Sequence, residues 1–253
     1  MKEDNVAKLI IFSGAGLSAE SGLSTFRDNN GLWAKHDPME VCNYKNWLKN
    51  FNLVHDFYNL RRKELKQAKP NDMHKFLAKL SSIFESSLQK QIEIIHVTQN
   101  VDDLLERAGV ENVVHLHGEL TKIICPQCET ILNIGYEEFM PHDCETCGYK
   151  YLKPFIVFFF EEAPKYRLLH QVFSNLTNKD CVVVIGTSAN VIDINSLLIR
   201  RTGQEKIGFK ILNNLEYSPN IMESLFDMKL YMTATQAINS IQEGLIDFFN
   251  KSN

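Results

Sequence analysis

Residues 8–19 read KLIIFSGAGLSA, and this stretch decides the fold. Its first half, Lys8 to Ser13, is a short apolar run that ends at a glycine, which predicts a buried strand entering a tight turn. Its second half, residues 14–19, has the pattern G-x-G-x-x-A, in which backbone N–H groups can approach a pyrophosphate where a helix begins. The same pattern also fits a strand-to-helix turn that binds no ligand, so the rest of the sequence has to decide.

The strand signal returns further along the chain. Residues 92–98, 181–186 and 207–212 are short runs rich in β-branched residues, and helical stretches lie between them. This alternation predicts an α/β protein with a Rossmann-like, doubly wound parallel sheet.

Two regions interrupt this rhythm. Residues 38–85 contain no strand signal but have the apolar spacing of two helices, and residues 121–153 hold four cysteines and few large apolar side chains. We expect both to be insertions that together form a smaller, helical and zinc-binding domain. The segments expected to form the Rossmann-like domain are residues 1–37, 86–120 and 154–253.

Composition and charge exclude several classes of protein. Of the 253 residues, 44% are hydrophobic and 23% are charged, which suits a globular protein with a buried core. The chain has 27 basic and 31 acidic residues without a long basic run, so nucleic acid is not an expected partner. Neither a secretion signal nor an apolar run of the roughly 20 residues that cross a membrane is present. We therefore expect a cytoplasmic protein without membrane attachment, whose oligomeric state stays open, with a monomer as one option.

Four of the six cysteines form two C-x-x-C pairs, Cys125 with Cys128 and Cys144 with Cys147. Such pairs place four thiolates around a tetrahedral zinc ion, and the closed shell leaves no position for water. We therefore predict a structural zinc site that orders the cysteine-bearing insertion. A redox pair and a zinc ribbon that binds nucleic acid are the alternatives, but neither accounts for the glycine turn. Cys181, inside a predicted strand, is expected to be a buried thiol.

Polar side chains directly follow two of the predicted strands. Gln99, Asn100 and Asp102 come after the second strand, and His117 comes after another short apolar run. The carboxyl ends of parallel strands are where α/β sheets bind ligands, and an imidazole in that place can act as a general base. His115, on the same strand face, competes for this role, and a histidine that only caps a loop is the structural alternative.

Several segments resemble the sirtuins, the family of NAD-dependent protein lysine deacylases. They are the glycine turn with its continuation, then TFR and GLW, then TQNVD, ERAG and HLHGEL, and finally GTS and NLE. Because these segments keep the family's order on both sides of the cysteine pairs, the resemblance extends from residue 8 to about residue 236. The matching segments are residues 14–22, 25–27, 31–33, 98–102, 106–109, 115–120, 186–188 and 214–216.

The resemblance implies a reaction that consumes NAD as a cosubstrate. The carbonyl oxygen of an acyl-lysine, on a protein or peptide substrate, attacks the anomeric carbon of the nicotinamide ribose and expels nicotinamide. His117, which directly precedes a glycine as the family's catalytic histidine does, then deprotonates a ribose hydroxyl, and hydrolysis yields free lysine and O-acyl-ADP-ribose. Asn100 and Asp102 are implied as further catalytic residues. The implied NAD contacts are Gly14, Ala15, Gly16, Ser18, Thr25, Phe26, Arg27, Trp33, Gln99, Asn100, Asp102, Gly186, Thr187, Ser188, Asn214 and Ala234.

One further pair concerns the acyl group. Tyr58 and Arg61 are three residues apart and so share a face of a predicted helix. A phenol beside a guanidinium can bind a carboxylate, and this pair resembles the one by which demalonylase and desuccinylase sirtuins, bacterial members included, hold an acidic acyl chain. We therefore expect removal of succinyl or malonyl groups besides acetyl groups. A solvated arginine beside a core tyrosine is the alternative.

Residues 153–161 resemble the segment that pairs with the substrate peptide, which implies Val157 and Phe159 as substrate contacts. Phe160, however, stands where family members usually carry glycine. If its ring blocks the acyl-lysine, mono-ADP-ribosyl transfer becomes the favoured alternative. A non-catalytic NAD-sensing module is a second alternative, since it requires only the glycine turn.

Overall fold

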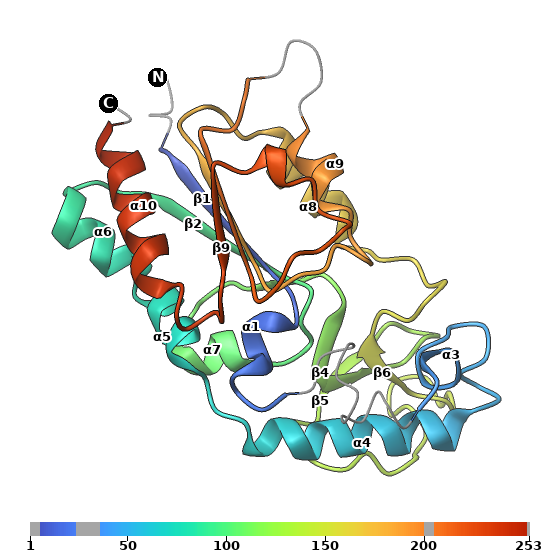
Figure 1. The fold of residues 1–253 in the computed structure, drawn as a ribbon. Coiled ribbons are helices and arrows are strands. Elements are labelled where there is room, and N and C mark those ends of the chain that lie inside the picture. Colours follow the sequence, from blue (N-terminus) through green and yellow to red (C-terminus); the bar gives the residue numbers. More distant parts are fainter. Residues whose placement is uncertain (1–5, 24–35, 200–204, 252–253) are drawn as a thin grey trace, which may run out of the picture.

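A six-stranded parallel sheet forms the centre of the computed structural model, which describes residues 6–23, 36–199 and 205–251 (Figure 1). The strand order is β3-β2-β1-β7-β8-β9, and all neighbours in it are parallel. The chain thus builds one half of the sheet outward from β1 and the other half outward from β7, which confirms the predicted doubly wound fold. The strands are β1 (Lys8–Ser13), β2 (Glu93–Thr98), β3 (Val114–His115), β7 (Cys181–Ile185), β8 (Phe209–Asn214) and β9 (Met228–Tyr231).

Both faces of this sheet are apolar and covered by helices. Successive residues of β1 alternate between two separate cores: Leu9 and Ile11 belong to one, and Ile10 and Phe12 to the other. This alternation is the period of two that a strand imposes, and the continuous apolar run supplies both cores. Figure 1 shows the two helical layers, one on each side of the sheet. They contain α5 (Asp72–Ala78), α6 (Leu80–Leu88) and α10 (Ile238–Lys251) on one side, and α8 (Tyr166–Ser174) and α9 (Ile194–Leu198) on the other.

A smaller antiparallel sheet, in the order β5-β4-β6, lies beyond the carboxyl edge of the large sheet, next to α4 (Figure 1). Apolar residues of α4 such as Phe57 pack against Leu120 and Phe158, so this unit has a core of its own. The elements are β4 (Gly118–Ile124), β5 (Ile131–Asn133), β6 (Lys153–Ile156), α3 (Pro38–Val41) and α4 (Phe51–Gln67).

Helix α5 and most of α6 fall within the predicted helical insertion 38–85, but both helices pack on the large sheet. Their buried residues Met73, Leu80 and Phe84 share the core of Leu9. The apolar spacing predicted these helices because it reports that one face is buried, and it does not say which sheet buries that face. Residues 72–88 thus pack on the large sheet, and the predicted domain boundaries stay predictions.

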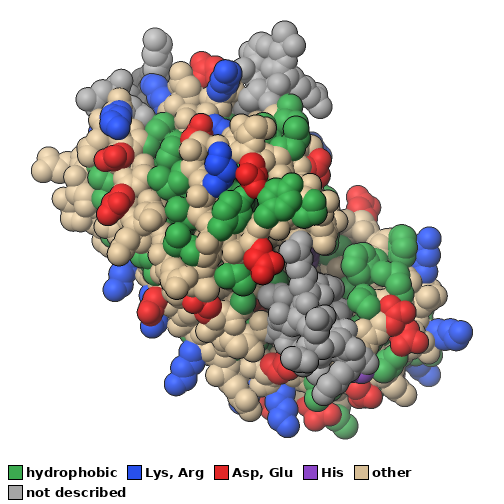
Figure 2. Space-filling view, viewed as in Figure 1, with side chains coloured by type: hydrophobic (Ala, Val, Ile, Leu, Met, Phe, Trp, Pro, Cys, Tyr) green, Lys and Arg blue, Asp and Glu red, His purple; other side chains and the backbone are tan. Residues whose placement is uncertain are grey.

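The surface carries side chains of every kind. Figure 2 shows acidic, basic and hydrophobic side chains intermixed over the face seen. Among the described residues, no helix is both long enough and apolar enough to cross a membrane.

Candidate active site and metal centre

The glycine turn lies at the carboxyl end of β1, directly against the end of β7. A Cβ atom added to Gly14 or Gly16 would lie only 2.7 or 2.6 Å from backbone atoms of Gly186. The N–H groups of Gly14 and Gly16 donate to the carbonyls of Ile185 and Gly186, both over 2.9 Å. Packing alone therefore requires these glycines, and the turn is a rigid, preformed wall before any ligand binds.

A cavity of about 1180 Å³ opens beside this turn, between the carboxyl edge of the large sheet and the smaller unit. It is lined by every described residue that the sequence predicted for catalysis, NAD binding or substrate binding. Thr25, Phe26, Arg27 and Trp33 lie outside the described residues. The lining residues that were predicted are Gly14, Ala15, Gly16, Ser18, Tyr58, Arg61, Gln99, Asn100, Asp102, His117, Val157, Phe159, Gly186, Thr187, Ser188, Asn214 and Ala234.

Side chains from α1 (Gly16–Ala19) and from the loop after β2 meet in a hydrogen-bonded chain at this edge. Ser18, on α1, donates to Asp102 Oδ2 over 2.9 Å and lies 3.2 Å from Asn100 Nδ2, which donates to it. The N–H of Asn100 donates to Thr98 Oγ1 over 3.0 Å. Burial raises the pKa of Asp102. These hydrogen bonds join the glycine turn to the loop after β2, and they hold the Asn100 amide and the Asp102 carboxylate side by side.

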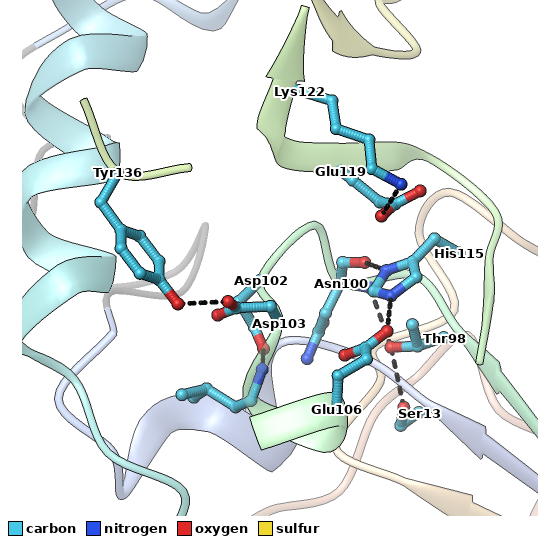
Figure 3. Close-up of polar contacts among 11 residues, drawn as sticks. Ser13, Thr98, Asn100, Asp102, Asp103, Glu106, His115, Glu119, Lys122 and Tyr136 are labelled. Atoms are coloured by element: carbon cyan, nitrogen blue, oxygen red, sulfur yellow. Dashed lines mark hydrogen bonds and ion pairs between the residues drawn. The ribbon is translucent and has the colours of Figure 1, made fainter. Parts of the chain in front are cut away.

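His115 takes no part in lining the cavity, because both of its ring nitrogens are engaged elsewhere (Figure 3). Nδ1 lies 2.9 Å from the Asn100 carbonyl, and Nε2 lies 2.6 Å from a carboxylate oxygen of Glu106, on α7 (Leu104–Ala108). Burial would lower the pKa of His115, but the hydrogen bond and charge of Glu106 outweigh it and raise that pKa. These two contacts occupy both ring nitrogens, so neither is open to a hydroxyl in the cavity. His115 is therefore a support for Asn100, and the competition for the role of base favours His117.

His117 does face the cavity. Its Nδ1 lies 3.0 Å from the Gln99 carbonyl, which can only accept, so Nδ1 carries the proton and Nε2 keeps its lone pair. Burial lowers the pKa of His117, which favours the neutral ring. The following Gly118 has φ +86°, and a Cβ there would lie 2.0 Å from the Phe155 carbonyl oxygen. The glycine after the histidine is thus needed where β4 pairs with β6, opposite Ile156, and it holds His117 at the cavity.

Tyr166 contacts His117 in the cavity and was not predicted from the sequence. Its hydroxyl lies 2.9 Å from Nε2 of His117, although the two residues are 49 positions apart. No local spacing signals such a contact, because it depends on where the start of α8 meets the end of β3.

The predicted acyl-binding pair lies at the other end of the cavity, on α4. Tyr58 is 1% exposed, burial raises its pKa well above the usual value, and its hydroxyl bonds to the thiol of Cys42. Arg61 is half-buried and lines the cavity beside it. The adjacent Arg62 is fully buried instead and donates to the carbonyls of Glu137 and Leu120 over 3.1 and 3.3 Å. The two arginines therefore have different roles: Arg62 joins structural elements, and Arg61 faces the cavity.

Phe160 lies at the rim of the cavity and does not fill it, because its side chain is 65% exposed. Its φ of +66° is the left-handed conformation that favours glycine, and Lys45 Nζ lies 4.6 Å from the centre of its ring. Beside it, the buried Lys153 forms an ion pair of 3.0 Å with Glu161, which also accepts from the Phe158 N–H over 2.7 Å. This pair, which the sequence did not reveal, fixes the loop that carries Phe160.

The four cysteines of the two C-x-x-C pairs converge in the smaller unit, with all four Sγ atoms within 4.8 Å of one another. The Cys125–Cys147 and Cys128–Cys144 sulfur distances are 3.6 and 3.7 Å. Zn–S bonds of about 2.3 Å in a tetrahedron place sulfurs about 3.8 Å apart, so the set fits zinc. Cys181 is fully buried in β7, as predicted.

Residues 14–193 match the sequence profile of the Sir2 family. The chain belongs to the Sir2 family. It is 62% identical over 251 residues to an NAD-dependent protein deacylase of Helicobacter hepaticus, covering 96% of this chain and 98% of the other. An enzyme of the same name from Campylobacter jejuni is 43% identical over 242 residues, covering 96% of both chains.

Solved structures of Sir2 homologues share the fold of this Sir2 family member. One complex with ADP-ribose has a TM-score of 0.78 and 29% identity and covers 97% of this chain and 92% of the other. A Sir2 homologue in complex with NAD has a TM-score of 0.77 and 30% identity and covers 96% and 90%.

Proposed function

We propose that this Sir2 family protein is an NAD-dependent protein deacylase that removes acyl groups from lysine side chains. The observation that carries the proposal is the placement of His117, whose unprotonated Nε2 faces the cavity beside Asn100 and Asp102. The names of the two bacterial relatives, and a Sir2 structure with a deacetylated peptide and acetyl-ADP-ribose, support the same activity.

The residues around the cavity fit NAD in size and in chemistry. The rigid turn at Gly14 and Gly16 and the facing loop at Gly186 would hold the phosphates, and Gln99, Asn100 and Asp102 would surround the nicotinamide ribose. NAD, when bound, supplies the electrophilic ribose carbon that the acyl oxygen attacks. The chain itself holds the ribose, excludes water and provides the base.

The role of His117 follows from its tautomer. Because Nδ1–H is held by the Gln99 carbonyl, the ring presents Nε2 as its acceptor, and a neutral imidazole can take the proton of a ribose hydroxyl there. Asn100 and Asp102, fixed through Ser18, orient the ribose.

We further propose that acidic acyl groups bind at Tyr58 and Arg61. The Arg61 guanidinium lies on the cavity wall, where a succinyl or malonyl carboxylate could form charge-assisted hydrogen bonds. Tyr58 lines the same cavity, and its hydroxyl, which contacts the Cys42 thiol, could donate to the same carboxylate.

The test is mass spectrometry of the purified protein with NAD and matched acetyl-lysine and succinyl-lysine peptides. A deacylase gives free lysine peptide, nicotinamide and O-acyl-ADP-ribose in equal amounts. Protein carrying ADP-ribose instead would support the transferase alternative, and absence of any product from either peptide would contradict catalysis.

A further inference from the structure

The atom of His117 that has to accept a proton is already hydrogen-bonded in the ligand-free protein. Nε2 lies 2.9 Å from the hydroxyl of Tyr166, the first residue of α8. The two ring centroids are 6.0 Å apart at an interplanar angle of 51°, so the rings do not stack. The hydroxyl makes the contact, and a phenylalanine in this place would lose it without changing the shape of the ring.

The direction of this hydrogen bond follows from the other side of the imidazole. Nδ1 donates to the Gln99 carbonyl, so the neutral ring has only Nε2 left as an acceptor. Burial raises the pKa of Tyr166, which keeps the phenol protonated and able to donate. The phenol O–H therefore points at the Nε2 lone pair.

An imidazole nitrogen has one lone pair in the plane of its ring, so two hydroxyls compete for it. In the deacylation proposed above, Nε2 accepts the proton of a ribose hydroxyl, and that hydroxyl must take the place of the Tyr166 phenol. We propose that Tyr166 is a positioning residue that holds Nε2 of His117 in the ligand-free enzyme and yields it to the cosubstrate. This inference rests on the proposed function.

The location of Tyr166 allows this exchange. Its side chain is half-buried and lines the cavity, whereas Leu169 and Phe173 anchor α8 in the core with 2% and 1% exposure. Rotation of one phenol at the first position of the helix can therefore free Nε2 without moving the helix. The Gln99 contact meanwhile keeps the imidazole in place.

The experiment compares Tyr166→Phe with the wild type, and Tyr231→Phe is the matched control. Tyr231 also donates a hydrogen bond, to Glu223, but it does not line the cavity. Loss of one hydrogen bond from the ligand-free state should raise kcat/KM for NAD about 2- to 10-fold in Tyr166→Phe. The value of kcat at saturating NAD should stay unchanged, because the phenol has already left in that complex. Tyr231→Phe should change neither parameter.

A spectroscopic measurement checks the contact without turnover. The ¹⁵N resonance of Nε2, assigned by its loss in His117→Gln, should move towards that of a free acceptor nitrogen in ligand-free Tyr166→Phe. An unchanged resonance, an unchanged or lower kcat/KM, or a lower kcat would overturn the inference. If the wild type forms no O-acyl-ADP-ribose, the proposed function fails, and the resonance still decides whether Tyr166 holds Nε2.

Discussion

The cavity has two walls that differ in their chemistry. The wall formed by the large sheet consists of close-packed glycines and of polar groups such as Asn100 and His117, held by backbone contacts. The wall formed by the smaller unit carries Tyr58, Arg61 and Phe160, on a helix and a loop that share one apolar core, and a second core with the cysteines lies next to it. Under the proposed function, the first wall would hold groups that every substrate needs, and we expect the second to hold groups that distinguish one acyl chain from another. Substitutions on the two walls should therefore have different effects.

The largest effect is expected on the sheet wall, from His117→Ala. Loss of a general base typically lowers kcat by about 10²- to 10⁴-fold. The loss should be the same for acetyl and succinyl peptides, because the base acts on the ribose and not on the acyl chain. Turnover is measured with both peptides, and NAD binding by calorimetry should persist because the glycine turn is untouched.

The matched control for this variant is Glu106→Gln, which acts on the neighbouring histidine. It weakens the ion pair with His115 and leaves His117 in place. A clearly smaller loss of kcat is expected. Full activity of His117→Ala, or a larger loss from Glu106→Gln, would contradict the assignment of the base.

The second-largest effect concerns the zinc site in the smaller unit, which forms the second wall. We expect one zinc ion per chain, and Cys125→Ser should release it and unfold the cysteine-bearing segment, because the small core of that segment includes two of the expected zinc ligands, Cys125 and Cys144. Elemental analysis and thermal unfolding measure both outcomes, and Cys181→Ser, in the large sheet, should leave the zinc content unchanged. Freshly purified protein without metal would contradict the prediction.

Arg61→Met, on the second wall, should affect one class of substrate and not the other. Charge-assisted hydrogen bonds to a carboxylate contribute about 1.5 to 3 kcal/mol, so kcat/KM for succinyl-lysine peptides should fall roughly 10- to 100-fold. Acetyl-lysine peptides have no carboxylate to lose and should react nearly as before. Lys63, exposed on the same helix, supplies the control Lys63→Met, whereas the buried Arg62 would disturb folding. Equal losses on both peptides would indicate that Arg61 is structural.

The two walls were predictable from sequence to different degrees. The apolar run 8–13 and the polar residues after it placed the sheet wall correctly, because a buried parallel strand and its carboxyl end are encoded within a few residues. Tyr166 and the Lys153–Glu161 pair were not predictable, because each depends on contacts between distant or irregular segments. For Tyr58 and Arg61, the helical spacing placed both side chains on one face, and the resemblance to desuccinylase sirtuins suggested that they meet an acidic acyl group.

The same limit applies to the fold. The sequence predicted helices α5 and α6 but not that they pack on the large sheet. Amphipathic spacing shows that one face of a helix is buried, but it does not show which part of the protein covers that face. Strand β9 was not predicted from the sequence, because it is a short edge strand of four residues, none of which is fully buried.

Mildly acidic pH should destabilise both units. Burial lowers the pKa of His55, in the smaller unit, and of His74 and His96, in the large one, to about 4. These values lie below that of an unfolded histidine, so the unfolded chain binds more protons, and stability is lost as the pH falls from about 6.5 towards 4. Each histidine should lower the free energy of unfolding by about 2 kcal/mol between pH 7.5 and 5. Urea unfolding at pH 7.5 and at pH 5 measures this loss of stability. In His96→Gln the loss between the two pH values should be smaller than in the wild type by the contribution of one histidine, about 2 kcal/mol. The same loss in the variant and the wild type would contradict the prediction.

The smallest effect is expected at Phe160, on the second wall. Its left-handed backbone, with φ +66°, costs an L-residue about 1 to 2 kcal/mol, which glycine avoids. Phe160→Gly and Phe160→Ala both remove the ring and its contact with Lys45, so the difference between them isolates the backbone. Glycine gains more freedom in the unfolded chain, which offsets part of the relief. Phe160→Gly should therefore exceed Phe160→Ala by about 1 kcal/mol in the free energy of unfolding, or roughly 2 to 4 °C in Tm. If alanine is as stable as glycine, the loop relaxes out of the left-handed conformation when the ring is removed, and the ring itself holds that conformation at the rim of the cavity.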